Sequence, residues 1–426
     1  MSQVKQPRIF LGVVDIAGQI GDYRSGYENL GLQVFTMVFD RNPQYPDRRY
    51  SFVLYDLYPR RLLKPTNLSA SILRKVFSFL VVTPAFYIAL GWAALKCDIF
   101  QLMWITDERW KYILPALKIL KKKVVVNFVG SDIRYVPRFI QELDMLGLDH
   151  HDNETLMKNT ISQQIAVGQP LRTLRVAERH ANLILSSPDQ AQLALRPYSN
   201  FAIPLRYSDI TFNPSKSNPQ PVLVHANTER NIYGTNAVLD AIEKAKQMSS
   251  VPFDFILLEG KSNSEVLEIL SKSDIVVYSP YMQGPGKFGL EALAAGCVLL
   301  TGHDPQYIRY PRNPPIVNVT AENLNEKLLY YIGHDEERTH LAAKGRLWVE
   351  ENFNLEKICL DILKKLDESN EQPDYIPEFF RNHATFNSKW DSPDAVTVCN
   401  RWTRYVSDCP WYNVHVPPGD RAGLRF

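Results

Sequence analysis

The sequence predicts an α/β protein made of two doubly wound domains that face each other across a cleft, with an extended arm after them. Apolar strand-like segments alternate with helix-compatible segments in residues 1–215 and again in residues 222–372. Steady alternation of this kind implies right-handed crossovers and parallel sheets. Residues 213–221 (NPSKSNPQP) are rich in Pro, Ser and Asn and separate the two series as a linker. A chain of 426 residues is also too long to fold around one ordinary hydrophobic core.

Bulk composition excludes several classes of protein. Lys and Arg number 48 against 46 Asp and Glu, for a net charge of +2. We therefore expect no nucleic-acid partner, because such binders carry a basic excess. The five cysteines are odd in number and form no CxxC pair, so we expect a reducing compartment and neither a disulfide framework nor a zinc site. The start MSQVKQPRIF does not read as a signal peptide, which favours a cytoplasmic protein.

The N-terminal series is expected to form the first domain, residues 1–215. In chain order we expect the strand RIFLGVV, the loop DIAGQIG, a helix ending at Gly31, the strands LQVFTMVF and DIFQLMW, the helix RWKYILPALKILKKK, and the strands VVVNFVG and ANLILSSPD. Gly31 is a natural C-terminal stop for the first helix. VVVNFVG is rich in β-branched residues, which is typical of a buried parallel strand.

One segment of this domain has an unusual composition. Residues 76–95 contain no charge, are preceded by Arg74 and Lys75, and carry Pro84 near their middle. Their length could span a bilayer, but a span here would divide one sheet between two sides. We favour a buried helix, or two helices broken at the proline, packed on the sheet. The alternative is peripheral contact of residues 60–96 with a membrane surface, helped by the nearby basic residues.

The second series is expected to form a domain of residues 222–372. It reads in order as the strand PVLVHA, the helix GTNAVLDAIEKAKQM, the strand FDFILLEG, the helix SEVLEILSKS, the strand DIVVYSP, a short helix LEALAAG, the strand CVLLTG, and one long helix from about AENLNEKLL to WVEENF. Residues 373–426 are rich in aromatic residues and proline and show no helical period. We expect them to form an extended arm that packs on the domains.

The stretch QGPGKFGLEALAAG, residues 283–296, is the clearest candidate for a ligand site. Its glycines let the backbone approach a ligand, and the start of a helix offers N–H groups and a partial positive charge to a phosphate. Lys287 is expected in the loop, and Glu291 in the first helical turn is suited to a ribose diol. A plain glycine turn has the same pattern, so spacing alone leaves both interpretations open.

With this stretch and three others in order, residues 8–370 resemble the retaining GT-B glycosyltransferases of the glycosyltransferase-4 type, which have two Rossmann-like domains. Residues 274–302 resemble the family's E-x7-E block. The resemblance implies that Glu291 binds the ribose and that Gln283, a catalytic candidate, contacts the donor sugar in place of the family's first acid. The remaining donor-binding candidates are Arg230 and Gly234, in HANTERNIYGT, and Gly286, Lys287, Phe288 and Gly289.

Two N-terminal stretches complete the resemblance. VVVNFVGSDIR, residues 124–134, resembles the family's GSD loop, which implies Asp132 as a catalytic candidate and Gly130 and Arg134 on the acceptor side. DIAGQIG, residues 15–21, resembles the first glycine loop and adds Gly18 and Gln19 to the acceptor side.

Three positions depart from the family's usual residues. Val129 stands where a histidine is common, Tyr233 where a lysine is usual, and Gln283 where an acid is usual. Each departure removes a charged or titratable group. We expect Lys287 to supply the charge on the diphosphate that Tyr233 lacks.

The resemblance implies a glycosyltransferase that moves a sugar from a nucleotide sugar to a glycan or lipid-linked acceptor with retention, in surface polysaccharide synthesis. No cofactor and no metal are expected, since no DxD pair is present. The protein would be cytoplasmic, with membrane contact placing it at the inner face. The alternative, suggested by the three lost charges, is a non-catalytic relative that binds glycans or acts as a scaffold.

Overall fold

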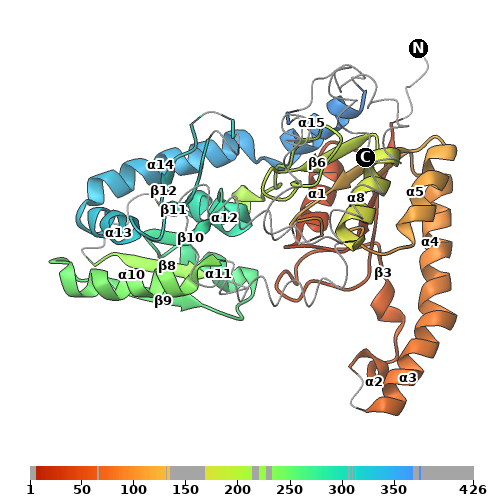
Figure 1. Ribbon diagram of the computed structural model, residues 1–426, viewed down its shortest axis with the longest axis horizontal. Helices are drawn as coiled ribbons and strands as arrows, with labels where there is room; N and C mark the ends of the chain where they lie inside the picture. The colour runs from red at the N-terminus through yellow and green to blue at the C-terminus, as the bar shows by residue number, and fades with distance from the viewer. Residues whose placement is uncertain are drawn as a thin grey trace.

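The computed structural model describes residues 6–64, 67–130, 132–134, 168–213, 220–226, 233–305, 308, 310–311, 313–367 and 374–375. It contains two parallel sheets with helices around them (Figure 1). The predicted α/β class, with two doubly wound units, is therefore confirmed.

The first sheet has seven strands in the order β3-β2-β1-β4-β5-β6-β7, and every neighbouring pair is parallel. The strands are β1 (Arg8–Val13), β2 (Gln33–Val38), β3 (Phe52–Val53), β4 (Ile99–Met103), β5 (Lys123–Asn127), β6 (Leu183–Ser186) and β7 (Ser199–Asn200). The chain order reverses on either side of β1, between β1 and β4. A ligand is expected outside the carboxyl ends of the strands at such a switch point.

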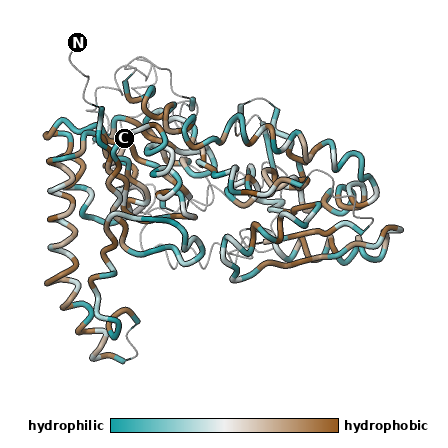
Figure 2. The backbone as a smooth tube through the Cα atoms, turned by 180° about the vertical axis from the view of Figure 1, so that it is seen from behind, coloured by the Kyte–Doolittle hydropathy of each residue, from teal (hydrophilic) through white to brown (hydrophobic). Residues whose placement is uncertain are grey.

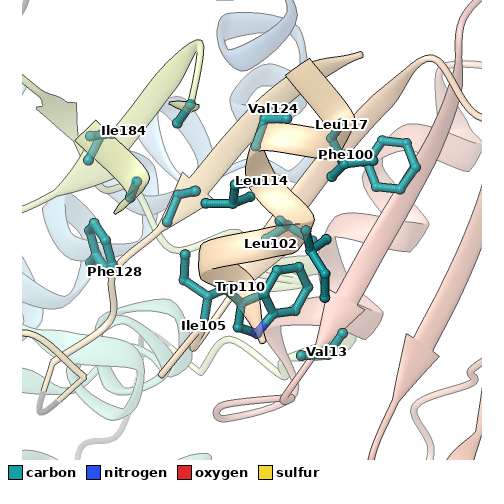
Figure 3. Packing of buried hydrophobic residues seen from close by; sticks show 14 of the residues in the cluster. Val13, Phe100, Leu102, Ile105, Trp110, Leu114, Leu117, Val124, Phe128 and Ile184 are labelled. Atoms are coloured by element: carbon teal, nitrogen blue, oxygen red, sulfur yellow. The ribbon is translucent and has the colours of Figure 1, made fainter. Parts of the chain in front are cut away.

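Helices cover both faces of this sheet. The helical segments of this half of the molecule are α1 (Gln19–Asn29), η1 (Leu54–Leu57), α2 (Arg60–Leu63), α3 (Leu68–Phe77), the π turn η2 (Ser78–Val82), α4 (Thr83–Lys96), α5 (Trp110–Ile119), α8 (Gly168–His180) and η3 (Tyr207–Asp209). Figure 3 shows how Leu114 and Leu117 of α5 pack on Phe100 of β4 and Val124 of β5. The apolar residues of α5 recur three or four apart, so they lie on one face of the helix and enter this core.

The second sheet has five strands in the order β12-β11-β10-β8-β9, again all parallel. The strands are β8 (Val222–Ala226), β9 (Asp254–Leu258), β10 (Ile275–Gln283), β11 (Val298–Gly302) and β12 (Ile316–Asn318), and the helices are α10 (Thr235–Met248), α11 (Asn263–Leu270), α12 (Gly286–Ala295), α13 (Leu324–Gly333) and α14 (Asp335–Asn352). Ser262 begins α11 with a reciprocal capping box to Glu265, which satisfies two N–H groups at the helix start.

Two predicted helices differ from those observed. The single long helix expected after residue 320 is two helices, because His334 leaves the helical conformation between α13 and α14. The short helix expected near Leu290 begins earlier, at Gly286. Lys287 therefore lies in the first turn of α12 rather than in a loop. Glu291 lies in the second turn rather than the first.

The last described helix returns to the first sheet's half of the molecule. α15 (Leu355–Asp367) packs on α1, where Sγ of Cys359 lies 3.7 Å from the carbonyl oxygen of Tyr23. Beyond it, Tyr375 pairs with Tyr198 beside β7. These two contacts tie the end of the second series to the first half. The predicted domain limits stay predictions, and the arm beyond residue 375 lies outside the described residues.

Residues 57–97 form a projecting hairpin-like arm, with α2 and α3 at its far end and α4 returning to the sheet (Figure 1). Residues 68–96 form a continuous apolar helical segment that is long and apolar enough to cross a membrane by length and composition. The expectation that this segment is buried on the sheet is wrong for most of its length. Only Phe86, Leu90 and Ala93 of α4 are buried, and α3 buries no residue.

Candidate functional site

A cavity of about 610 Å³ lies at the carboxyl ends of strands from both sheets. Its lining includes Asp15 after β1, Trp104 after β4, Ser187 after β6, Gly260 after β9 and Gln283 at the end of β10. A cavity lined by both halves of the chain therefore lies where the ligand site was predicted. Eight of the predicted site residues line it: Gln19, Gly130, Arg134, Gln283, Gly286, Lys287, Phe288 and Glu291.

The first turn of α12 forms one wall of this cavity. Gly286 has a φ of +53°, and a Cβ atom there would lie 2.4 Å from the Tyr278 hydroxyl. Only glycine therefore fits between this turn and Tyr278. The first N–H groups of a helix have no partner within the helix. Where the first turn of a helix lines a cavity, these N–H groups can donate hydrogen bonds to an anion, and the helix dipole adds a favourable partial charge.

Glu291 lies behind this turn, with a relative exposure of 3%. Its Oε1 accepts a hydrogen bond of 2.8 Å from Nδ2 of Asn263. Burial raises the pKa of the Glu291 carboxyl above its ordinary value, and the charge of Lys287 and the Asn263 amide partly offset that rise. A buried acceptor beside an amide is suited to bind hydroxyl groups, which can donate to it without adding charge.

Gln283 directs its amide oxygen to the protein. Its Oε1 accepts a hydrogen bond of 2.8 Å from the backbone N–H of Asp304. The side chain lines the cavity, so its NH₂ group is the part that can donate to a ligand. A carboxylate at this position would offer acceptors alone, so the amide changes the polarity of the contact but keeps the ability to bind a hydroxyl.

Lys287 connects the two halves of the molecule. Its Nζ lies 2.6 Å from Oδ2 of Asp22 in α1 and 2.5 Å from the carbonyl oxygen of Ala17. Asp22 is completely buried and also contacts Nε of Arg48 at 2.9 Å and Nε of Arg206 at 3.0 Å. One carboxylate thus holds three cations from three segments. In this structure Lys287 lines the cavity with its charge already paired.

Asp132 shapes its own loop and does not line the cavity. Its Oδ1 accepts from the backbone N–H groups of Gly130 at 2.9 Å and Val129 at 3.2 Å. Burial raises the pKa of its carboxyl to about 7, against the lowering effect of those N–H groups. The geometry makes Asp132 a residue that positions the loop, and its predicted catalytic role has no support from its orientation.

Arg134 does line the cavity, together with its partner. Its Nη2 lies 3.1 Å from Oδ2 of Asp189, and its Nε donates to the Asp189 carbonyl at 3.1 Å. This pair joins the loop after β5 to the loop after β6.

Three further predicted residues, all glycines, lie elsewhere. A Cβ atom at Gly18 would lie 2.7 Å from the Tyr45 ring, at Gly234 2.4 Å from the Tyr281 ring, and at Gly289 3.0 Å from Leu299. Gly18, Gly234 and Gly289 do not line the cavity, and packing of side chains against them accounts for the small residue. Arg230 lies outside the described residues.

Several lining residues escaped the sequence interpretation. Asp15 accepts a hydrogen bond from the backbone N–H of Ile20 at 2.8 Å and so satisfies one N–H group in the first turn of α1. Burial raises the pKa of its carboxyl. Its place directly after a strand was a usable signal. Trp104 lines the cavity with a φ of +58°, a backbone state that is costly for a bulky residue. Tyr45 lines the cavity from a loop that carries no recognisable motif.

Metal ligands are not grouped in the part of the chain that is described. No set of three or more His, Cys, Asp or Glu residues there could hold a metal ion. The expected independence from metals and cofactors stays a prediction.

Comparisons with solved structures give the fold. Sucrose-phosphate synthase from Thermosynechococcus elongatus is similar with a TM-score of 0.55 and 13% identity over 84% of this chain and 98% of that one. An alpha-glucosyltransferase in complex with UDP has a TM-score of 0.53 and 13% identity over 85% and 100% of the two chains. The alpha-glucosyltransferase in complex with UDP and a 13-mer DNA gives 0.51 and 13% over 86% and 100%.

No protein-family model matches the chain, and a search of curated proteins finds no relative. The structural similarity spans both sheets, so the GT-B fold predicted for this chain is confirmed. At 13% identity the structural similarity shows the fold but does not show the activity.

Proposed function

We propose that this chain is a glycosyltransferase that takes a sugar from a nucleotide sugar and transfers it to a hydroxyl group with retention of configuration. The observation that carries the proposal is the cavity between the two sheets, with the first turn of α12 on its wall and the buried carboxyl of Glu291 behind it. An anion-binding helix start next to a hydroxyl-binding carboxylate matches the diphosphate and ribose of one nucleotide.

In this proposal the nucleotide lies on the second half of the molecule. The ribose hydroxyls donate to Glu291, either to its second oxygen or in place of Asn263. The diphosphate accepts from the N–H groups of residues 286–288, and the base lies toward Gly260 and Lys261, which line the same cavity. Gln283 donates its NH₂ group to a hydroxyl of the donor sugar.

The reaction breaks the bond between the anomeric carbon and the diphosphate and forms one to the acceptor oxygen. The products are the glycoside, a nucleoside diphosphate and the acceptor proton. The task of the site is to stabilise charge on the leaving diphosphate, which the α12 dipole and N–H groups are placed to do. A phosphate oxygen takes the acceptor proton in this scheme, so Val129 in place of a histidine is compatible with activity.

The acceptor lies against the first half of the molecule, beside Trp104 and Arg134. A glycan or a lipid-linked saccharide is the acceptor class we propose, in synthesis of a surface polysaccharide in the cytoplasm. One structurally similar protein was solved with DNA. We do not extend that acceptor to this chain, because its net charge of +2 provides no basic excess for a DNA backbone.

A thermal-shift screen with UDP-, GDP-, ADP- and CMP-sugars tests the proposal, because a ligand that binds only the folded chain raises its melting temperature. We expect one nucleotide class to raise it and the Glu291→Ala variant to lose the response. No shift with any nucleotide sugar, together with intact folding, would favour the non-catalytic glycan-binding or scaffold alternative. The paired charge of Lys287 and the uncharged Tyr233 are the features that favour that alternative.

A further inference from the structure

The projecting arm, residues 57–97, exposes an unusual share of the apolar surface. Twelve of the nineteen large apolar side chains that are exposed among the described residues lie between Leu63 and Leu95. Phe79 and Ile88 are each 73% exposed, and Leu95 is 83% exposed. A contiguous apolar surface of this kind marks an interaction site. Figure 2 shows the hydrophobic colouring along this arm, which stands away from the rest of the chain.

These exposed side chains lie on one side of the helix. The π turn η2 inserts one residue into the helical repeat. With that residue allowed for, Leu68, Ile72 and Phe79 before the turn lie on the same side as Ile88 and Leu95 after it, at 3.6 residues per turn. The π turn thus keeps a single apolar face continuous along residues 68–96.

The opposite side of the helix faces the protein. Phe86 and Leu90 are buried there, and the guanidinium of Arg74 lies over the rings of Tyr55 at 5.9 Å and Tyr58 at 5.6 Å. The helix is therefore held by one side, and the exposed apolar side has a defined direction.

Charge on the arm is of one sign. Residues 57–97 contain Arg60, Arg61, Lys64, Arg74, Lys75 and Lys96 and no Asp or Glu, although acids and bases are nearly equal in the whole chain. The side chains of Arg60, Arg61 and Lys64 are exposed at the far end. An apolar face bordered by unopposed cations is complementary to the acyl chains and anionic headgroups of a lipid bilayer.

The path of the chain decides how such a surface would meet a bilayer. Both ends of the arm join strands of the same sheet, β3 and β4, so a single crossing by the helix would place one sheet on both sides of the membrane. A crossing would also carry Arg60, Arg61 and Lys64 through the hydrocarbon, which is costly. The arm is therefore suited to lie in the headgroup region rather than to span the membrane, with Tyr87 and Trp92 at a depth that amphipathic rings favour.

We infer that residues 57–97 dock the protein on the anionic surface of a lipid bilayer. The inference stands apart from the proposed transfer reaction, because docking needs no nucleotide and no turnover. It places the acceptor side of the cavity on the half of the molecule that contacts the membrane. A lipid-linked acceptor then reaches the cavity from the surface to which the arm is bound.

Flotation of the full chain with vesicles tests this inference without any activity assay. We expect binding to vesicles of phosphatidylcholine mixed with phosphatidylglycerol and much weaker binding to phosphatidylcholine alone. The variant Phe79→Glu with Ile88→Glu should lose most of the binding. The variant Arg60→Glu, Arg61→Glu, Lys64→Glu should weaken it by at least on the order of a hundredfold, because each lost cation costs about fivefold and the added carboxylates repel the anionic headgroups.

Matched variants elsewhere separate docking from general effects. Leu347→Glu changes an apolar side chain of α14 that is 59% exposed, and Lys244→Glu with Lys246→Glu and Lys272→Glu makes the same charge change on exposed lysines of the second half. Both should bind vesicles like the unchanged chain. Thermal unfolding should be the same for all variants, since each substituted side chain is exposed.

Three results would overturn the inference. The unchanged chain could stay unbound with anionic vesicles, or the control charge variant could lose as much binding as the arm variant. The third is a dimer by light scattering that the Phe79→Glu, Ile88→Glu variant converts to a monomer while neither binds vesicles, which would assign the face to a second copy of the chain.

Discussion

Gln283 and Asp132 each use a side-chain oxygen to accept a hydrogen bond from a backbone N–H of a loop at the cavity. For Gln283 this leaves a donor group at the cavity wall. For Asp132 the hydrogen bonds to the loop direct the whole carboxyl away from the cavity. The sequence located both residues at strand ends but could not tell these outcomes apart. Side-chain direction depends on the path of the loop, and one residue type fits either direction.

Gln283→Ala should weaken binding of a nucleotide sugar by about tenfold, the loss of roughly one good hydrogen bond. Binding of the matching nucleoside diphosphate should be nearly unchanged, because it lacks the sugar that Gln283 contacts. Calorimetric titration with both ligands measures the two effects. Gln283→Glu is the control, since a carboxylate can accept from Asp304 and from sugar hydroxyls. An equal loss of affinity for both ligands would show that Gln283 does not contact the sugar.

Asp132→Asn should change how stability depends on pH. The folded-state pKa of about 7 lies above the ordinary value of 3.8 for an aspartate, so between these pH values the folded chain holds this proton and the unfolded chain has lost it. This group's stability contribution is therefore present below about pH 4 and is lost as pH rises through about 7, by on the order of 2 to 4 kcal/mol.

The Asn variant has no proton to lose at this site. As pH rises from acidic values to about 8, the free energy of unfolding of this variant in urea should therefore increase relative to that of the unchanged chain. Asp240→Asn, on the exposed face of α10, should show no such gain. Parallel pH profiles for Asp132→Asn and the unchanged chain would contradict the buried, proton-holding state.

Some of the helices and strands around the site could be predicted from the local sequence pattern. The strand predicted over residues 274–280 overlaps β10, because an apolar run is a local signal. β10 continues to Gln283, however, and α12 begins at Gly286, where a glycine loop was predicted. The start of α12 was placed too late, since its first turn contains two glycines, Gly286 and Gly289, which are poor helix formers. The packing of α15 on α1 joins residues more than 300 positions apart, and no local signal reports it.

Gly26→Ala should loosen this α1–α15 packing. Its Cβ atom would lie 2.7 Å from Sγ of Cys359 and 2.8 Å from the backbone oxygen of Leu355, so α15 has to move. We expect a loss of about 1 to 3 kcal/mol in the free energy of unfolding, which exceeds the gain in helix propensity.

Gly91→Ala in α4 is the matched control for this variant. A Cβ atom there meets nothing within 4 Å, so the substitution should stabilise the helix by up to about 1 kcal/mol. Urea unfolding of both variants measures the difference. Equal effects at the two positions would mean that α15 does not press on α1.

At the scale of the whole molecule, two sheets contributed by separate halves of the chain meet at one cavity. The order of strands and helices predicted that architecture, because each βα unit repeats the same pattern. The Asp22 cluster, defined by Asp22, Arg48, Arg206 and Lys287, could not be predicted, since its members come from segments that only the folded chain brings together.

Asp22→Asn and Lys287→Met should differ in their cost. Without Asp22, three cations remain near one another in a buried place, and the loss should be about 3 to 5 kcal/mol. Without Lys287, Asp22 keeps Arg48 and Arg206, and methionine can pack on the Tyr45 ring, so the loss should be less than half as large. Urea unfolding compares the two. A larger loss for Lys287→Met would show that the link between the halves, rather than the buried carboxylate, dominates.

The second half of the molecule should bind a nucleotide through α12 and Glu291, and calorimetric titration with UDP, GDP, ADP and CDP measures this binding. We expect one of these nucleotides to bind the unchanged chain and the control Glu326→Ala on α13 equally well. It should bind Glu291→Ala at least tenfold more weakly, as for loss of a charged hydrogen-bond acceptor. Equal binding to all three proteins, or no binding to any of them, would show that α12 and Glu291 do not form a nucleotide site.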